Sequence, residues 1–229
     1  MVVIVRTAAM VAGIVAAGSA VRRATHGWGA TDAERRELLP GDELVADPAI
    51  VATRAVTIDA PAGEVWSWLV QIGQDRGGMY SYDALENLLG LNIHSTDEIR
   101  PEWQSLAVGD RIVLVPAGWA RQKAGYALPV VRLDPSSTLV LRQSPPEHPW
   151  DAVWSFHLRT LADGRTRLIS RSRSRRRHGI RGSSDVALDA LMDPVTWFMT
   201  RKMLLGIKQR AERRGAPAET EDPAATLAG

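Results

Sequence analysis

The sequence contains no cysteine, which excludes disulfide bridges, thiolate metal ligands and cysteine nucleophiles. It also lacks a glycine-rich phosphate loop, a Gly-x-Ser-x-Gly elbow and a paired-carboxylate signature. Between residues 165 and 181 there are many arginines and no acidic residue, although the net charge of the whole chain is only +2.

The composition is that of a globular protein, with 45% hydrophobic and 24% charged residues among 229. This length suits one domain of about 150 residues with appendages at its ends. We predict four parts in chain order: an apolar N-terminal helix over 1–21, a linker with a short helix over 22–50, a folded domain over 51–214, and a disordered tail over 215–229.

The first 21 residues form an apolar stretch that is interrupted by Arg6 and followed by Arg22 and Arg23. Three interpretations are open: a single-pass membrane anchor, a signal peptide cleaved after the small residues at 18–20, or an ordinary helix. We expect the anchor. The arginines after the stretch then favour a main domain on the cytoplasmic side.

The next segment carries one clear helix signal. Thr31 and Glu34 have the spacing of a capping box, and the Pro40-Gly41 pair predicts a turn after the helix. Nothing else in this segment indicates chemistry, so we interpret it as a solvated linker that wraps the domain.

The folded domain opens with a strand over 52–59 and a helix over 61–73, whose apolar stripe begins at Val65. A second short helix follows a Gly-Gly turn, with Asp83 and Glu86 in a capping-box-like arrangement and an apolar face formed by Leu85, Leu88 and Leu89. We expect this helix, and the tyrosines just before it, to form the rim of a pocket.

The second half of the domain reads as antiparallel strands from residue 111 to 175 and a helix over 185–214. In the last strand the small side chains should face inward, and the arginines should face water. His157 on the preceding strand is placed on the same wet face by its alternation with Trp154, Phe156 and Leu158.

Several stretches resemble the START-like (SRPBCC, Bet v 1-like) superfamily, whose members are often described as polyketide cyclase/dehydrase-type proteins. The stretch TRAVTIDAPAGEVWSWLVQIG is similar to the opening strand and first helix of that superfamily. RGGMYSYDALENLLG, IHSTDEI, PEWQ and FMTRKMLLGIKQRAE, together with GATDAE and LPGDEL in the linker, are similar to an actinobacterial subgroup.

The resemblance implies an α+β helix-grip fold, in which a curved antiparallel sheet surrounds a long C-terminal helix and two short helices follow the first strand. It also implies an apolar cavity, and therefore binding or transport of an apolar or amphipathic small molecule that is lipid-like or polyketide-like. Candidate ligand-binding residues, predicted from their types and positions, are Arg76, Tyr80, Tyr82, Trp103, Trp154, Phe156, Met199 and Met203.

An alternative is a cyclase/dehydrase-type enzyme that uses His94 as an acid/base group. His94, Asp97 and Glu98 lack a further ligand at standard spacing, so we predict no metal site and no cofactor.

The other alternative is a basic interaction module. The face formed by Arg167, Arg171, Arg173 and Arg175 could contact an anionic membrane surface. RNA or ribosome binding through these arginines is a further possibility, but we do not favour nucleic acid as a partner.

Overall fold

The computed structural model describes residues 24–88, 90–119, 125–148, 150–175 and 183–215. The helices are α2 (Asp32–Arg36), α3 (Ala62–Val70), α4 (Asp83–Leu88) and α5 (Ser183–Gly215), with 3₁₀ helices η1 (Asp42–Val45) and η2 (Pro101–Trp103). The strands are β1 (Ile50–Ile58), β2 (Arg111–Val115), β3 (Tyr126–Asp134), β4 (Thr138–Gln143), β5 (Ala152–Thr160) and β6 (Thr166–Ser174).

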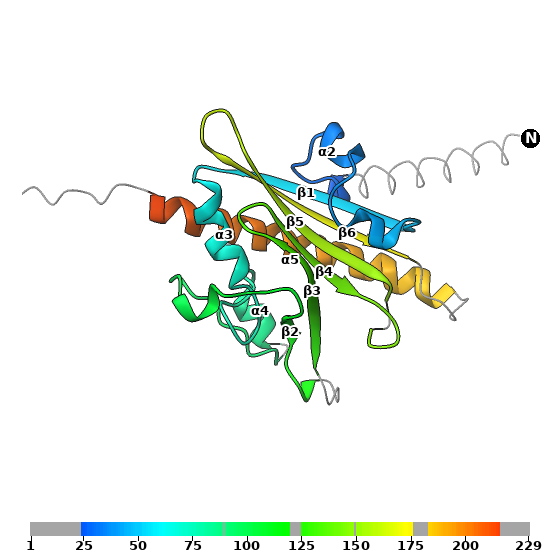
Figure 1. Cartoon of the computed structure of the whole chain (residues 1–229). Coiled ribbons are helices and arrows are strands. Elements are labelled where there is room, and N and C mark those ends of the chain that lie inside the picture. Colours follow the sequence, from blue (N-terminus) through cyan, green and yellow to red (C-terminus); the bar gives the residue numbers. More distant parts are fainter. Residues whose placement is uncertain (1–23, 89, 120–124, 149, 176–182, 216–229) are drawn as a thin grey trace, which may run out of the picture.

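The strands form one curved antiparallel sheet in the order β1-β6-β5-β4-β3-β2, and α5 lies across one of its faces (Figure 1). Helices α3 and α4 lie between β1 and β2 in the chain, as expected. The predicted α+β architecture, with a curved sheet, two short helices after the first strand and a long C-terminal helix, is therefore confirmed.

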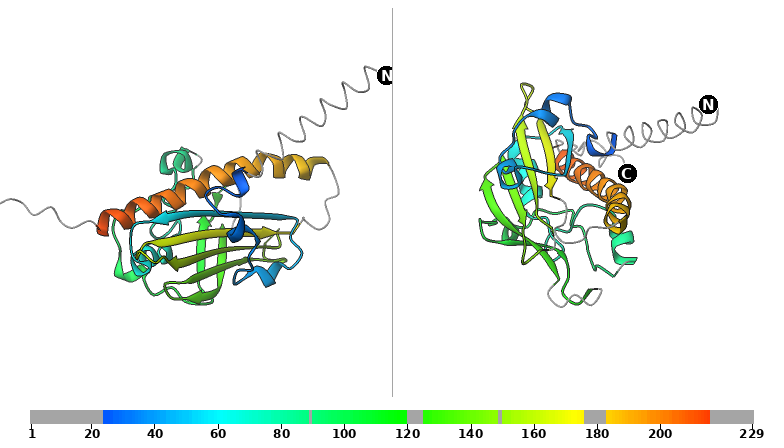
Figure 2. Two further views of the ribbon diagram at one scale, coloured as in Figure 1. Left: turned by 90° about the horizontal axis from the view of Figure 1, so that it is seen from above. Right: turned by 90° about the vertical axis from the view of Figure 1, so that its right-hand side faces the viewer.

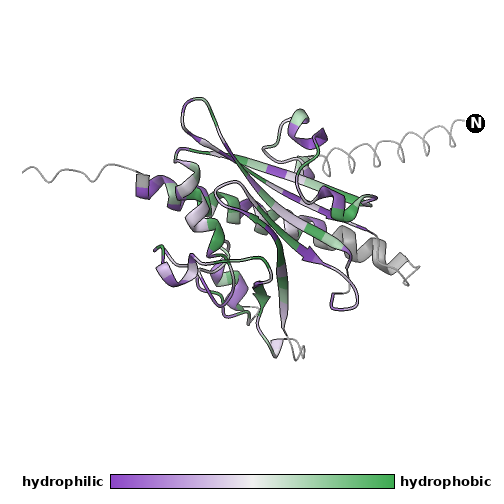
Figure 3. Cartoon of the chain, viewed as in Figure 1, coloured by the Kyte–Doolittle hydropathy of each residue, from purple (hydrophilic) through white to green (hydrophobic). Residues whose placement is uncertain are grey.

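The main core fills the space between the sheet, α3 and α5. The apolar stripe of α3 is fully enclosed, with Val65, Trp68 and Leu69 at most 2% exposed. Met203 and Ile207 of α5 pack against the same cluster as Phe156 of β5. Hydrophobic and hydrophilic residues follow one another along the strands (Figure 3), which allows one face of the sheet to pack against this core.

The opposite face of the sheet is covered by the part of segment 24–49 that begins at Ala30 (Figure 2), whereas Trp28 packs against the main core. The capping box of α2 is present as predicted, since Thr31 and Glu34 bond each other's backbone N–H groups. Beyond α2, Leu39 packs on Ala55 and Ile169, and Val45 packs on the strands β4 and β5. The segment that we predicted to be a solvated linker is therefore part of the folded domain.

A buried arginine attaches this segment to the sheet. Arg171 is 1% exposed, and its Nη1 donates to a carboxylate oxygen of Asp42 at 2.7 Å and to the backbone oxygen of Glu37. Its Nη2 donates to the backbone oxygen of Glu34, and its Nε donates to the Thr53 hydroxyl. Every guanidinium nitrogen thus has a partner, which a buried charge requires.

Neighbouring arginines on β6 make similar contacts. Arg167 donates to both carboxylate oxygens of Glu34, at 2.7 and 2.8 Å. Burial disfavours the charged form of Glu34, but hydrogen bonds from Arg167 and Thr31 outweigh it and lower the pKa of Glu34 to about 2. Arg173 donates to the backbone oxygen of Val45. The prediction of a water-exposed arginine face is therefore wrong for Arg167, Arg171 and Arg173, because segment 24–49 covers them, whereas Arg165 and Arg175 are substantially exposed.

His157 lies on this covered face as well, so its predicted exposure is also wrong. It is 3% exposed and lies within hydrogen-bond distance of the Ser155 hydroxyl, 2.9 Å from Nε2 to Oγ. Burial and the nearby charge of Arg171 lower the pKa of His157 to about 4. The imidazole is therefore neutral at physiological pH, and its role is in packing beneath segment 24–49.

Two predicted parts fall outside the described residues. The N-terminal apolar helix over 1–21 is one, and the tail from residue 216 onward is the other. Among the helices that are described, none combines the length and the apolar character needed to cross a bilayer.

Replacing Asp42 with Ala should lower the free energy of unfolding by about 3–5 kcal/mol, because it leaves the Arg171 charge buried without its carboxylate. The matched control is Asp47→Ala, an exposed carboxylate on the same segment, which should change stability by less than about 0.5 kcal/mol. Urea denaturation of both variants measures the difference. Equal stabilities for the two variants would contradict a structural role for the Arg171–Asp42 pair.

Candidate ligand-binding cavity

A cavity of about 330 Å³ lies between the inner face of the sheet and α5. Its wall is completed by Met79, Ser81, Glu86, Leu91 and Ile93, which lie in and around α4. The surface of the cavity is mainly apolar, although several polar side chains contribute to it. The complete lining consists of Arg54, Met79, Ser81, Glu86, Leu91, Ile93, Leu114, Gln143, Trp154, Ser172, Val195, Thr196, Met199, Thr200 and Met203. This volume is within the range of about 300–1,000 Å³ that is usual for small-molecule sites.

The sheet contributes five residues to the lining, namely Arg54, Leu114, Gln143, Trp154 and Ser172. Trp154 of β5 donates from its indole Nε1 to the hydroxyl of Ser170 on β6, at 3.0 Å. Its ring also contacts Phe156, with centroids 4.8 Å apart. The inward orientation predicted for the small side chains of β6 is confirmed, since Ser170 is buried and Ser172 lines the cavity.

Helix α5 provides the opposite wall, and its residues reach the cavity at helical spacing. Val195, Met199 and Met203 follow one another at intervals of four, so they lie along one face of the helix. Val195 is 49% exposed and Met203 is 2% exposed. The cavity therefore extends from an accessible end near Val195 to a closed end at the core.

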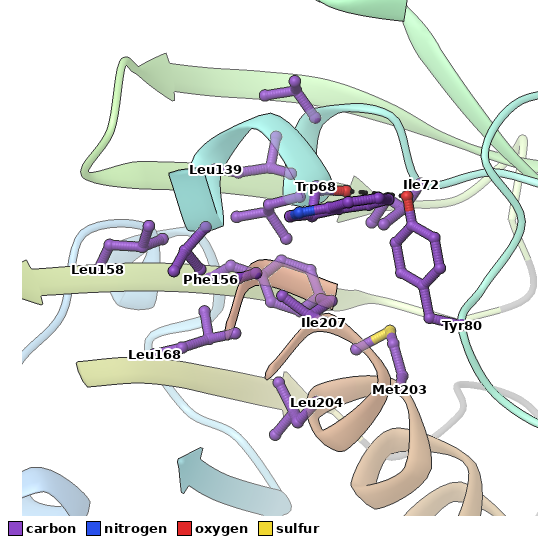
Figure 4. Packing of buried hydrophobic residues seen from close by; sticks show 14 of the residues in the cluster. Trp68, Ile72, Tyr80, Leu139, Phe156, Leu158, Leu168, Met203, Leu204 and Ile207 are labelled. Carbon is purple, nitrogen blue, oxygen red and sulfur yellow. Dashed lines mark hydrogen bonds between the residues drawn. The ribbon is translucent and has the colours of Figure 1, made fainter. Parts of the chain in front are cut away.

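The segment after α3 is fixed to α5 by a close backbone contact. Tyr80 adopts a left-handed conformation, with φ of 52°. A Cβ on Gly206 of α5 would lie only 2.2 Å from the Tyr80 carbonyl oxygen, so the absence of a side chain there permits the contact. The Tyr80 hydroxyl donates to the carbonyl of Trp68 (Figure 4). The same hydroxyl accepts a hydrogen bond from the side chain of Gln71. Tyr80 is therefore a core residue, and burial raises its pKa above the usual range.

Helix α4 is oriented differently from the prediction. Leu85 and Leu88 are 43% and 82% exposed, whereas Glu86 is only 2% exposed. The carboxylate of Asp83 accepts from the backbone N–H and hydroxyl of Ser95, rather than capping its own helix. Glu86 accepts a hydrogen bond from Ser81. The predicted capping box and apolar face of this helix are wrong, because polar contacts with neighbouring loop residues decide which side turns inward.

Three of the eight predicted ligand-binding residues line the cavity, namely Trp154, Met199 and Met203. Phe156 and Tyr80 are buried in the core beside it. Tyr82 stacks on Phe198 of α5 with ring centroids 4.2 Å apart, which places it outside the lining.

Arg76 and Trp103 lie together but away from the cavity. Arg76 donates from Nη2 to the carbonyl oxygen of Trp103. Burial lowers the pKa of Arg76. This hydrogen bond connects the loop after α3 to η2. Neither residue lines the cavity, so we assign the pair a structural role.

The candidate acid/base residue His94 is exposed and is not among the cavity-lining residues. Its ring Nε2 lies 3.3 Å from the side-chain oxygen of Asn92. Asp97 forms ion pairs with Arg210 and Arg213 of α5, at 2.9 and 3.2 Å. In the part of the chain that the structure describes, no group of three His, Asp or Glu residues could hold a metal ion.

Two charged residues of the cavity were missed by the sequence analysis. Arg54 is 3% exposed and lies on β1. A signal for it was present, because Val56 and Ile58 alternate with it and pack against the core. Glu86 had no such signal, since its orientation depends on Ser81 from outside the helix.

No protein-family model matches the chain, and no curated protein matches it. Among solved structures, a protein from Mesorhizobium loti is 18% identical, with 73% of this chain and 100% of that chain covered and a TM-score of 0.41. The Aha1 dimer from Colwellia psychrerythraea is 17% identical, with coverages of 70% and 98% and a TM-score of 0.36. A protein from Thermobifida fusca is 15% identical, with coverages of 71% and 93% and a TM-score of 0.43. At this level the similarity carries no information about function.

Substituting Gly206 with Ala should destabilise the protein by about 1–3 kcal/mol, because the new Cβ would collide with the backbone of Tyr80. Gly63 of α3 is the matched control, since a Cβ there would have nothing within 4 Å. Gly63→Ala should instead stabilise the protein by up to about 1 kcal/mol, through lower backbone entropy in the unfolded chain. Thermal and urea denaturation would show the opposite signs, and a stabilising Gly206→Ala would refute the contact.

Glu86→Gln should become progressively more stable than the wild type as pH rises. Burial, and to a lesser extent the charge of Asp83, raise the pKa of Glu86 in the folded state. The stabilisation from protonated Glu86 is therefore fully present at pH values below the pKa of Glu86 in the unfolded chain. It is lost as the pH rises through the higher pKa of Glu86 in the folded state. Gln resembles that protonated form at every pH. Unfolding free energies from pH 4 to pH 9, with the exposed Glu98→Gln as control, test this, and a pH-independent difference for Glu86→Gln would contradict it.

Proposed function

We propose that the protein is a helix-grip protein of the START-like type that binds an apolar or amphipathic small molecule between its sheet and α5. The observation that carries the proposal is the cavity itself, which has about 330 Å³ of space beside a well-packed core. The space is lined mainly by apolar side chains and opens to solvent near Val195, and both features are usual for small-molecule sites.

The lining defines how such a molecule would be held. Trp154 and Met199 offer a broad apolar surface from opposite walls, and Leu114 adds to it from β2. Burial of apolar ligand surface would drive binding at roughly 25 cal/mol per Å² before the costs of association. The partly exposed end near Val195 offers an entry route that requires no change in the core.

A cyclase/dehydrase-type reaction is the second candidate. It would require an acid/base group in the cavity, and Glu86 is the lining carboxyl that burial favours in its protonated form. This observation moves the acid/base role in that alternative from His94 to Glu86. If the protein converts a ligand, and if Glu86→Gln abolishes this turnover but retains the affinity for the ligand, the result would support an enzyme over a binding protein.

Binding can be tested with the neutral fluorescent probe N-phenyl-1-naphthylamine. The full chain should bind it with saturable fluorescence enhancement, and Ser172→Phe should weaken binding by about tenfold or more, because the phenyl ring occupies space in the cavity. Ser105→Phe, an exposed serine outside the lining, is the control and should bind as the wild type does. Absence of probe binding, or equal binding by both variants, would overturn the proposed cavity function.

A further inference from the structure

Arg54 differs from the other buried arginine of the sheet in its hydrogen bonding. The two side chains belong to neighbouring strands, since Arg54 of β1 is opposite Ser170, one residue before Arg171. Arg171, on the outer face, uses every guanidinium nitrogen. Arg54, on the inner face, is similarly enclosed at 3% exposed, but among the residues that the structure describes only its Nε has a partner, the backbone oxygen of Thr25 at 3.1 Å.

The terminal nitrogens of Arg54 have no hydrogen-bond partner among the described residues, and no carboxylate in the described part of the chain lies within ion-pair distance of them. Asp193 of α5 acts on Arg54 only through its longer-range charge. Burial lowers the pKa of Arg54 to about 10, so the side chain remains charged at pH 7. A buried charge without a close counter-charge is costly, and such groups concentrate where a ligand supplies the missing partner.

We propose that Arg54 receives the headgroup of an amphipathic ligand that carries a single carboxylate, with its apolar part between Trp154 and Met199. This inference rests on the proposed function. The position fits, because Arg54 lines the same cavity as these apolar residues. The two terminal guanidinium nitrogens match the two oxygens of a carboxylate in a bidentate pair.

The surrounding charges favour a singly charged anion over a phosphate monoester. Arg54 is the cationic residue of the cavity lining, and the negative charge of Asp193 already offsets part of its field. Glu86 faces the same cavity, so any ionisation of Glu86 would repel a ligand with a second negative charge. One further donor of the cavity supports the same headgroup. The side-chain oxygen of Gln143 accepts from the Tyr126 hydroxyl, and its NH₂ group has no hydrogen-bond acceptor among the described residues.

The experiment compares decanoic acid, decanol and decyl phosphate as competitors of N-phenyl-1-naphthylamine on the full chain. We expect decanoic acid to displace the probe at a concentration about tenfold or more below that of decanol, and below that of decyl phosphate. Arg54→Met should remove the preference for the acid over the alcohol, measured as the ratio of the two competitor concentrations within that variant. Arg132→Met, an exposed strand arginine outside the cavity, should retain the preference.

Equal affinities for acid and alcohol in the wild type, or an unchanged preference in Arg54→Met, would overturn the carboxylate assignment and leave the proposed cavity function standing. Tighter binding of decyl phosphate would overturn the choice of headgroup. Failure of the probe itself to bind would instead remove the proposed function.

A second measurement uses only the wild-type protein, so it does not depend on whether a variant folds. Decanoic acid labelled with ¹³C at its carboxyl group can be titrated in complex with the wild-type protein by NMR. Pairing with Arg54 should lower the pKa of the bound carboxyl below that of the free acid. A raised pKa, as expected for a carboxyl in an apolar cavity without a cationic partner, would overturn the inference even if Arg54→Met were unstable.

Discussion

Both faces of the sheet are buried, and burial of the outer face depends on the hydrogen bonds of the Arg171 guanidinium group. It forms hydrogen bonds with the Asp42 carboxylate and with backbone oxygens of Glu34 and Glu37, and so fixes the segment 24–49 against the outer face. With that face covered, β5 and β6 are buried on both sides, including polar residues such as Ser155 and His157. A sheet held rigidly in this way provides a fixed floor for the cavity on its inner face.

The cavity depends equally on how the loop after α3 meets α5. Gly206 allows the Tyr80 backbone to approach the helix, and the Tyr80 hydroxyl joins Gln71 and Trp68 in the core. The same segment then continues through Ser81 and Glu86, which form part of the cavity wall. The motifs that suggested a family resemblance, including LPGDEL, IHSTDEI and FMTRKMLLGIKQRAE, thus contribute Asp42, Ser95 and Gly206 to structural contacts, and most of their residues do not reach the cavity.

These contacts give the arginines of the protein distinct roles that composition alone does not distinguish. Arg167, Arg171 and Arg173 hold segment 24–49, so the basic stretch from residue 165 to residue 175 is largely neutralised within the fold. Contact with an anionic membrane stays a prediction, but only Arg175 among the four residues proposed for it is substantially exposed, and it pairs with Asp151 at 3.3 Å. Arg54 has the opposite character, because it is buried and its terminal nitrogens have no hydrogen-bond partner in the described part of the chain.

Local periodicity in the sequence determined the elements and much of their order: the alternation in β5 and β6, the stripe of α3 and the capping box of α2 depend on neighbouring residues and were correctly predicted. The inward position of Arg54 was also implied by its spacing from Val56 and Ile58, although its charge argued against it. Only the tertiary structure decided which polar faces are covered and which groups line the cavity. Burial of Arg171 depends on a backbone oxygen 137 residues away in the chain, and such long-range pairing leaves no periodic signal in the sequence. Burial of Glu86 depends on Ser81, which lies outside its helix and so outside the periodic pattern of that helix.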